Sequence, residues 1–293
     1  MALLPLLVLL AGIITVAFGA AAARRSPPSR ETAVAAGRAH AVRTAVAAIG
    51  LGLAAAVYVG AAQPGNSAPG GLGITALLVP VAFGIVHTVV VGVGELTWPR
   101  PDGEVRRARL VHRGLLDAAP DRLVLAAAVA GGLAVVTLVG GALLAGDSGR
   151  NFVWTADGFS GSTGPFPGHF YGLPAGLGLL VLALVAVAVL RLVANRPAVA
   201  TEDEWIETAL RRASAHRVLR VAVGVPLFVS GGLLLTGGNA LHSAAAGSGG
   251  PPLLGPVGAV IAVLGIVSML AGVVVSCLPA PSVPADAPAV GVP

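Results

Sequence analysis

Residues 72–93 read LGITALLVPVAFGIVHTVVVGV and contain no Asp, Glu, Lys or Arg. A helix needs roughly 20 consecutive apolar residues to cross the hydrocarbon core of a bilayer, so this run predicts a transmembrane helix. The same pattern recurs along the chain, and the predicted spans are about 3–22, 41–62, 72–93, 123–144, 173–192, 218–235 and 257–278. The sequence therefore predicts an all-α fold: a single polytopic transmembrane bundle of about seven spans over 1–278, followed by a disordered tail at 279–293.

The composition favours a membrane protein over a soluble one. Apolar residues make up 56% of the 293 residues and charged residues only 11%, whereas a soluble domain has about 25% charged residues. The net charge of +5 would indicate nucleic acid only if the bases clustered on a soluble face. They lie instead in the connections between spans, so we expect a lipid bilayer and no nucleic acid as partner.

The arginines alternate between connections. The first, third and fifth connections carry most of them, the second and sixth (63–71 and 237–255) carry none, and the fourth, 146–172, carries only Arg150. An excess of Arg marks the cytoplasmic connections of a membrane protein. The pattern predicts an N-terminus outside and a C-terminus inside. Every base is Arg, and Ala, Gly, Val and Pro are abundant, which is typical of high-GC bacteria, so we expect a location in the bacterial cytoplasmic membrane.

Several activities are excluded by what the chain lacks. It has no Lys, and therefore neither a retinal Schiff base nor a Gly-x-x-x-x-Gly-Lys phosphate loop, and it has no His-Glu-x-x-His zinc motif. With Cys277 as its one cysteine, it forms no intrachain disulfide. We expect no catalytic residue, no cofactor and no metal; a metal held by His169 and His242 is the weak alternative.

One face of the third span is small and polar. At 100° per residue, a sector about 80° wide around this helix contains Pro80, Gly84, His87 and Glu95. An ionisable residue within a span marks a functional site by default. Two hypotheses remain open: a neutral His87 that hydrogen-bonds to a neighbouring span as part of a packing face, or a site for protons or a solute. Both expect His87 to face another helix and not lipid.

Two other groups of residues are candidates. Gly258, Gly265 and Gly272 recur every seven residues in the last span, which predicts close helix packing. The connection 146–172 is rich in aromatics and predicted to lack secondary structure. Its candidate residues are Trp154, Phe166, His169 and Tyr171. They act either as an interfacial belt or as a lid or docking loop, since long irregular loops are often functional.

The segment 201–217 predicts an amphipathic helix. Thr201 and Glu204 form a capping box, and Trp205, Ile206, Ala209, Leu210 and Ala213 form one apolar stripe. We expect this helix to lie on the inner membrane surface and to continue into the sixth span. Residues 31–34 (Glu-Thr-Ala-Val) are similar to residues 207–210 (Glu-Thr-Ala-Leu). Each segment begins with a Glu nine residues before a His, which is His40 in the first case and His216 in the second. This indicates either related hairpins or chance similarity in an Ala-rich chain.

Two short motifs carry a resemblance. Thr97-Trp-Pro-Arg-Pro-Asp-Gly103 followed by Val105-Arg106, and Gly164-Pro-Phe-Pro-Gly168 with Tyr171-Gly-Leu-Pro174, are similar to elements of uncharacterised multi-pass integral membrane proteins of high-GC Gram-positive bacteria. The motifs cover about 20 residues. The resemblance implies a membrane location and brings no activity with it.

The leading functional hypothesis is a non-enzymatic membrane component, a scaffold or accessory subunit that packs against other membrane proteins or against itself. The alternative is a transporter of a small or amphipathic solute, whose identity the sequence does not indicate; a membrane-embedded enzyme is third. A polar cavity that reaches His87 and Glu95 would favour transport. A solid interior with an exposed glycine face on the last span would favour the scaffold.

Overall fold

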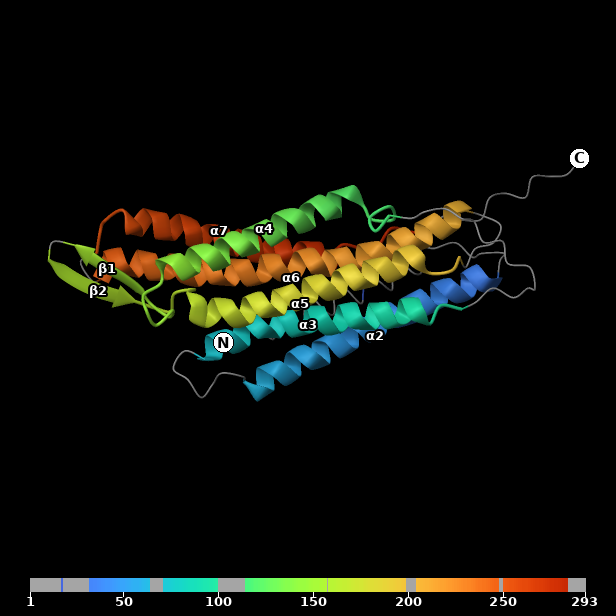
Figure 1. The fold of residues 1–293 in the computed structure, drawn as a ribbon, viewed down its shortest axis with the longest axis horizontal. Helices are drawn as coiled ribbons and strands as arrows, with labels where there is room; N and C mark the ends of the chain where they lie inside the picture. The colour runs from blue at the N-terminus through green and yellow to red at the C-terminus, as the bar shows by residue number, and fades with distance from the viewer. Residues whose placement is uncertain are drawn as a thin grey trace, which may run out of the picture.

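The computed structural model describes residues 17, 32–63, 71–99, 114–156, 158–198, 204–247 and 250–283. Its elements are α2 (Thr32–Ala62), α3 (Gly71–Leu96), α4 (Asp121–Leu144), β1 (Phe152–Ala156), β2 (Phe159–Thr163), α5 (His169–Asn195), α6 (Glu204–Gly247) and α7 (Leu254–Cys277). The helices form an elongated bundle with the two strands at one end (Figure 1). We call this the hairpin end, and the opposite end, where α3, α5 and α7 finish, the charged end.

The predicted helical fold class is confirmed for the described residues. Six helices are long and apolar enough to cross a membrane, and each overlaps one predicted span. The remaining predicted span, 3–22, lies outside the described residues apart from Ala17. The number of spans and the orientation of the termini stay predictions.

Helix α6 is much longer than the predicted span 218–235. Its 44 residues correspond to about 66 Å at 1.5 Å per residue, about twice the hydrocarbon thickness of a bilayer. It packs against α3, α4, α5 and α7 and lies at the centre of the bundle (Figure 1). The acids Glu204 and Glu207 occupy its first turn, where the helix dipole favours negative charge.

The prediction of a surface helix at 201–217 is therefore wrong in its placement. From Glu204 onward the segment is the first part of α6, and residues 201–203 lie outside the described residues. Ile206 and Leu210 are buried against Val34 of α2 and against Val283. Ile206, Leu210 and Ala213 of the apolar stripe thus pack inside the protein, whereas Trp205 is 70% exposed. Of the predicted disordered tail, residues 279–283 are described, and Val283 among them is buried.

The helices α6 and α7 approach each other through glycines. Gly224, Gly231 and Gly238 of α6 lie opposite Gly272, Gly265 and Gly258 of the antiparallel α7. A methyl group added at Gly231 would lie 2.6 Å from the carbonyl oxygen of Gly265. Only glycine permits backbones to come this close. We call this set of six glycines the α6–α7 glycine contact.

Helix α3 packs differently, because its glycines meet side chains. Gly84 faces Val225 and Leu182, and Gly92 faces Val189 of α5. Helix α2 packs mainly on α3 and lies at the edge of the bundle (Figure 1). Helix α3 also packs extensively on α5 and contacts α6, so it joins α2 to the rest of the bundle.

The connection 146–172 contains the two strands, so the prediction that it lacks secondary structure is wrong. Strands β1 and β2 are antiparallel, with Trp154 opposite Gly161. The Thr163 hydroxyl donates a hydrogen bond to the carbonyl oxygen of Ala240 at 2.9 Å. This contact fixes the strands to the last turns of α6.

Candidate functional site

The polar face predicted on α3 is buried along its length. Pro80, Gly84, His87 and Glu95 are all buried, and His87 is only 1% exposed. The imidazole packs beside the ring of Phe83, with 5.7 Å between centroids. Its Nδ1 has no hydrogen-bond partner among the described residues. The packing hypothesis expected a hydrogen bond to a neighbouring span, and for Nδ1 the described part of the chain provides none.

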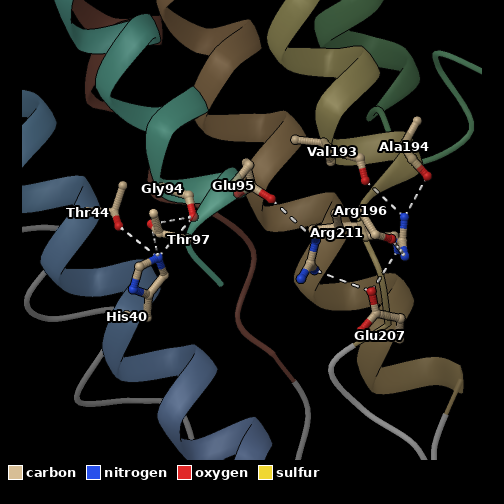
Figure 2. Close-up of polar contacts among 10 residues, drawn as sticks. All are labelled: His40, Thr44, Gly94, Glu95, Thr97, Val193, Ala194, Arg196, Glu207 and Arg211. Atoms are coloured by element: carbon tan, nitrogen blue, oxygen red, sulfur yellow. Dashed lines mark hydrogen bonds and ion pairs between the residues drawn. The ribbon is translucent and has the colours of Figure 1, made fainter. Parts of the chain in front are cut away.

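Glu95 belongs to a charged cluster that joins three helices. Its carboxylate lies 3.3 Å from Nε of Arg196, the residue directly after α5. Nη2 of Arg196 lies 3.4 Å from Glu207 Oε1, and Nε of Arg211 lies 2.7 Å from the same oxygen. Figure 2 shows this alternation of acid and base across α3, the end of α5 and α6. We call Glu95, Arg196, Glu207 and Arg211 the charged cluster.

Aromatic residues connect the charged cluster to α2. The guanidinium of Arg196 lies 3.9 Å from the centroid of the Trp98 ring, a cation–π contact. The His40 ring meets Trp98 edge-on at 5.8 Å. His40 Nε2 lies 2.9 Å from the carbonyl oxygen of Gly94 and can donate to it in the tautomer protonated at that nitrogen (Figure 2). The end of α3 is thereby bound from both sides.

Arginines of α6 bind the ends of two further helices. Arg211 donates from Nη1 to the carbonyls of Val193 and Ala194 at 2.9 and 2.7 Å, and from Nη2 to that of Arg196 at 2.6 Å. The buried Arg220 donates to the carbonyl of Leu278, next to the last residue of α7, at 3.0 Å. The last four carbonyls of a helix lack partners within it, and cations are favourable there. The arginines therefore act as helix caps.

The buried charges of this region are paired with one another or with helix ends. Arg196 and Arg211 pair with Glu95 and Glu207, and Arg217 lies within electrostatic reach of Glu95. Together with the caps from Arg211 and Arg220, these contacts hold the ends of α3, α5 and α7.

A small cavity lies beside the charged cluster. Its polar lining consists of Thr44, Glu95, Trp98 and Arg217, and its volume is about 10 Å³. That is close to the minimum that holds one water molecule. His87 does not line it. This cavity therefore gives no polar path from Glu95 to His87 of the kind that the transport hypothesis expects.

The aromatic candidates of the hairpin end are mostly packing residues. Trp154, Phe166 and Tyr171 are each 6% exposed or less. Trp154 rests on Gly161 and Gly250, and Tyr171 on Gly73. These three side chains join the strands and α5 to the bundle and do not form an exposed belt; the lid or docking role of the connection stays a prediction.

The two outer histidines have separate neighbours. His169 is exposed, with its ring against Gly149. His242 Nδ1 lies 3.1 Å from the carbonyl oxygen of Gly255. Within the described ranges, no group of three or more His, Cys, Asp or Glu could hold a metal ion.

The glycines of the last span face inward. Gly258, Gly265 and Gly272 form half of the α6–α7 glycine contact and are not exposed. The open glycines lie on α4, where a methyl group added at Gly131, Gly132 or Gly140 would meet no atom within 4 Å.

Sequence reasoning missed the charged cluster. Its one local signal is the pair Glu207 and Arg211, four residues apart and therefore neighbours on a helix. No protein-family model, curated protein or solved structure matches the chain.

Proposed function

We propose that the protein is a non-enzymatic, multi-pass component of a bacterial cytoplasmic membrane, a scaffold or accessory subunit that packs against another membrane protein or a second copy of itself. The observation that carries this proposal is the open glycine face of α4. The chemistry of the interior gives it independent support.

The interior supports the proposal because its charged groups are engaged with one another. Glu95, Glu207, Arg196 and Arg211 pair among themselves, and Arg211 and Arg220 also cap helix ends. The cavity beside them, of about 10 Å³, has space for about one water molecule. A solute larger than water could bind there only after these ion pairs and caps had separated.

The surface of α4 supports it more directly. Gly132 and Gly140 have open space where a side chain would stand, and at 100° per residue they lie about 80° apart around the helix. Val136 and Leu143, which are 69% and 79% exposed, lie on the same face between them. Lipid tails are as apolar as helix side chains, so helices in a bilayer associate chiefly where small residues let backbones approach. Small residues between exposed branched ones provide the groove and ridges of such a contact.

The proposed orientation places the charged end in the cytoplasm and the hairpin end outside. The arginine-rich connections of the sequence adjoin α2, α4 and α6 at their first residues, and these three helices begin at the charged end. Arg excess on one side of a membrane marks the cytoplasmic side. The proposed packing face of α4 is compatible with this orientation, since it faces away from the bundle.

The test is to replace Gly132 with Leu and to measure association. Wild-type protein purified in mild detergent should elute with a partner or as an oligomer, by size exclusion with light scattering and mass spectrometry. G132L should elute as the single chain with its fold retained. Gly50 of α2 is equally open, so G50L is the matched control and should associate normally. A wild-type chain that is always alone, or a G132L variant that still associates, would contradict the proposal.

A further inference from the structure

Three exposed arginines surround the bundle near the charged end. They are Arg43 of α2, Arg122 of α4 and Arg191 of α5, and we call them the arginine girdle. Within the described part of the chain, none of their guanidinium groups forms an ion pair or a hydrogen bond. By contrast, the arginines of the charged cluster are paired with its two glutamates. The charges of the girdle are therefore available to a partner outside the protein.

The three arginines lie at a similar depth along the bundle. One cluster of packed side chains includes a residue of each of their helices, namely Ala48, Leu123 and Leu190. Arg122 and Arg191 adjoin members of this cluster in the sequence, and Arg43 is five residues, or about 7.5 Å of helix, away from one. Helices α2 and α4 lie on opposite sides of the bundle (Figure 1). The arginines are thus distributed around the protein at one level and do not line a single pocket.

Each arginine of the girdle borders an exposed apolar surface. About one turn closer to the hairpin end, each of the three helices has an exposed branched residue: Val46, Leu125 and Val187. In the proposed membrane location such a surface faces hydrocarbon, where charge is costly. The stem of an arginine can lie along apolar surface while its guanidinium reaches the polar boundary. The girdle is therefore placed where the phosphate groups of one leaflet lie.

The opposite end of the molecule has no comparable set of cations. Among the described residues of the hairpin end, Arg150 is the one arginine, and its guanidinium lies 3.9 Å from the centroid of the Phe170 ring. At the charged end, the exposed Asp121 beside Arg122 lies in the first turn of α4, where the helix dipole favours it. The attraction for anions is therefore expected in one leaflet only.

We propose that the arginine girdle binds the headgroups of anionic phospholipids in the leaflet at the charged end, so that these lipids are enriched around the protein. A guanidinium can pair with phosphate through two parallel hydrogen bonds. In a zwitterionic lipid the headgroup's own ammonium competes for the phosphate, whereas an anionic headgroup has no such cation. This inference rests on the membrane location in the proposed function and not on the scaffold role.

The experiment measures which lipids contact the full protein in phosphatidylcholine vesicles. Spin-labelled phosphatidylglycerol or phosphatidylcholine is added, and the electron paramagnetic resonance spectrum gives the fraction of label that the protein immobilises. A cation near an anionic membrane surface favours association about fivefold, so the parent should prefer phosphatidylglycerol severalfold. The triple variant Arg43→Gln, Arg122→Gln, Arg191→Gln should lose most of this preference. The corresponding triple lysine variant keeps the charge and should retain most of it.

Arg150→Gln is the control, because Arg150 lies at the hairpin end, and it should leave the preference unchanged. The arginines of the connections outside the described residues are the same in every variant, so the comparison isolates the girdle. In the parent, salt at about 1 M should weaken the preference, because the Debye length is then about 3 Å. If the triple glutamine variant does not insert into vesicles, the three single variants take its place, and each should lose part of the preference.

Equal immobilisation of the two lipids by the parent would overturn the proposal, and so would a triple glutamine variant with the full preference. Displacement of the labelled lipid by inorganic phosphate at constant ionic strength would overturn it too, because the arginines would then bind a free anion in place of a lipid. A parent protein that immobilises neither lipid would contradict the membrane location itself. Equal immobilisation leaves that location intact, so the two failures are distinguishable.

Discussion

The two sides of α6 are built on different principles. Toward α7 it presents Gly224, Gly231 and Gly238, whose backbones touch those of the facing glycines. Toward α3 and α5 it packs apolar side chains such as Val225 against Val81 and Leu182. At the charged end of this side, Glu207 and Arg211 add ion pairs and helix caps.

The difference follows from the solvent. In lipid, helices gain little from burying apolar side chains against each other, so close backbone contact and polar contact are the main sources of specificity. The first gives a boundary that tolerates no added atom. The second gives one in which a few polar side chains at one end add to apolar side-chain packing along the helices. Substitutions can measure the contribution of each boundary to stability separately.

The largest effect is expected for Arg211→Met. It removes the three hydrogen bonds to the end of α5 and one partner of the buried Glu207. Breaking a buried ion pair from one side costs roughly 3–5 kcal/mol. The free energy of unfolding in detergent should fall by about that amount. Arg212→Met is the control, because Arg212 is exposed, and its effect should be close to zero. If both variants lowered the free energy of unfolding equally, the hydrogen bonds of Arg211 would not be what stabilises the contact between α6 and the end of α5.

Gly231→Ala should have the next largest effect. The added methyl would lie 2.6 Å from the Gly265 carbonyl oxygen, so the helices must separate. Overpacking of this kind costs roughly 1–3 kcal/mol. At the adjacent Gly232 the nearest atom is Leu77 Cδ2 at 3.9 Å, so Gly232→Ala should be tolerated. Thermal unfolding of both variants measures the difference, and a Gly231→Ala protein as stable as Gly232→Ala would refute backbone contact between α6 and α7.

The smallest effect is expected for Ser268→Ala. The Ser268 hydroxyl of α7 donates to the carbonyl of Leu227 in α6 at 2.8 Å. A hydrogen bond between membrane helices contributes about 0.6 kcal/mol on average. Ser276 donates within its own helix to Gly272, so Ser276→Ala should not weaken the boundary in this way. A loss above about 2 kcal/mol at Ser268 would exceed the range for such bonds and would give polar contact a larger share of the α6–α7 boundary.

The same contrast explains what the sequence could predict. The spans and the glycine spacing on α7 follow from residues close together in the chain, so hydropathy and a period of seven predict them. The charged cluster depends on Glu95 and Arg196, about a hundred residues apart. The position of each residue near a helix end indicates membrane topology, but nothing in the sequence indicates that the two side chains are in contact.

Two local features were predicted only in part or not at all, for identifiable reasons. The helix at 201–217 and its continuation into the sixth span were predicted, but not its burial, because Ile206 and Leu210 contact Val34, far away in the chain. The strands β1 and β2 have five residues each and are rich in Gly, Ser and Thr. So short a hairpin is marginal by itself, and it depends on contacts such as that of Thr163 with α6.

The seven-residue period of the α6–α7 glycine contact creates a problem of register. If α7 slid along α6 by one period, about 10.5 Å at 1.5 Å per residue, two of the three glycine pairs would form again with new partners. The repeat alone therefore does not select a single alignment. Arg220 does, because its hydrogen bond to Leu278 forms at one offset only, and the short connection between Gly247 and Leu254 limits the slide. The hydrogen bond from Arg220 to Leu278, which caps α7, therefore also fixes the register of the whole α6–α7 glycine contact.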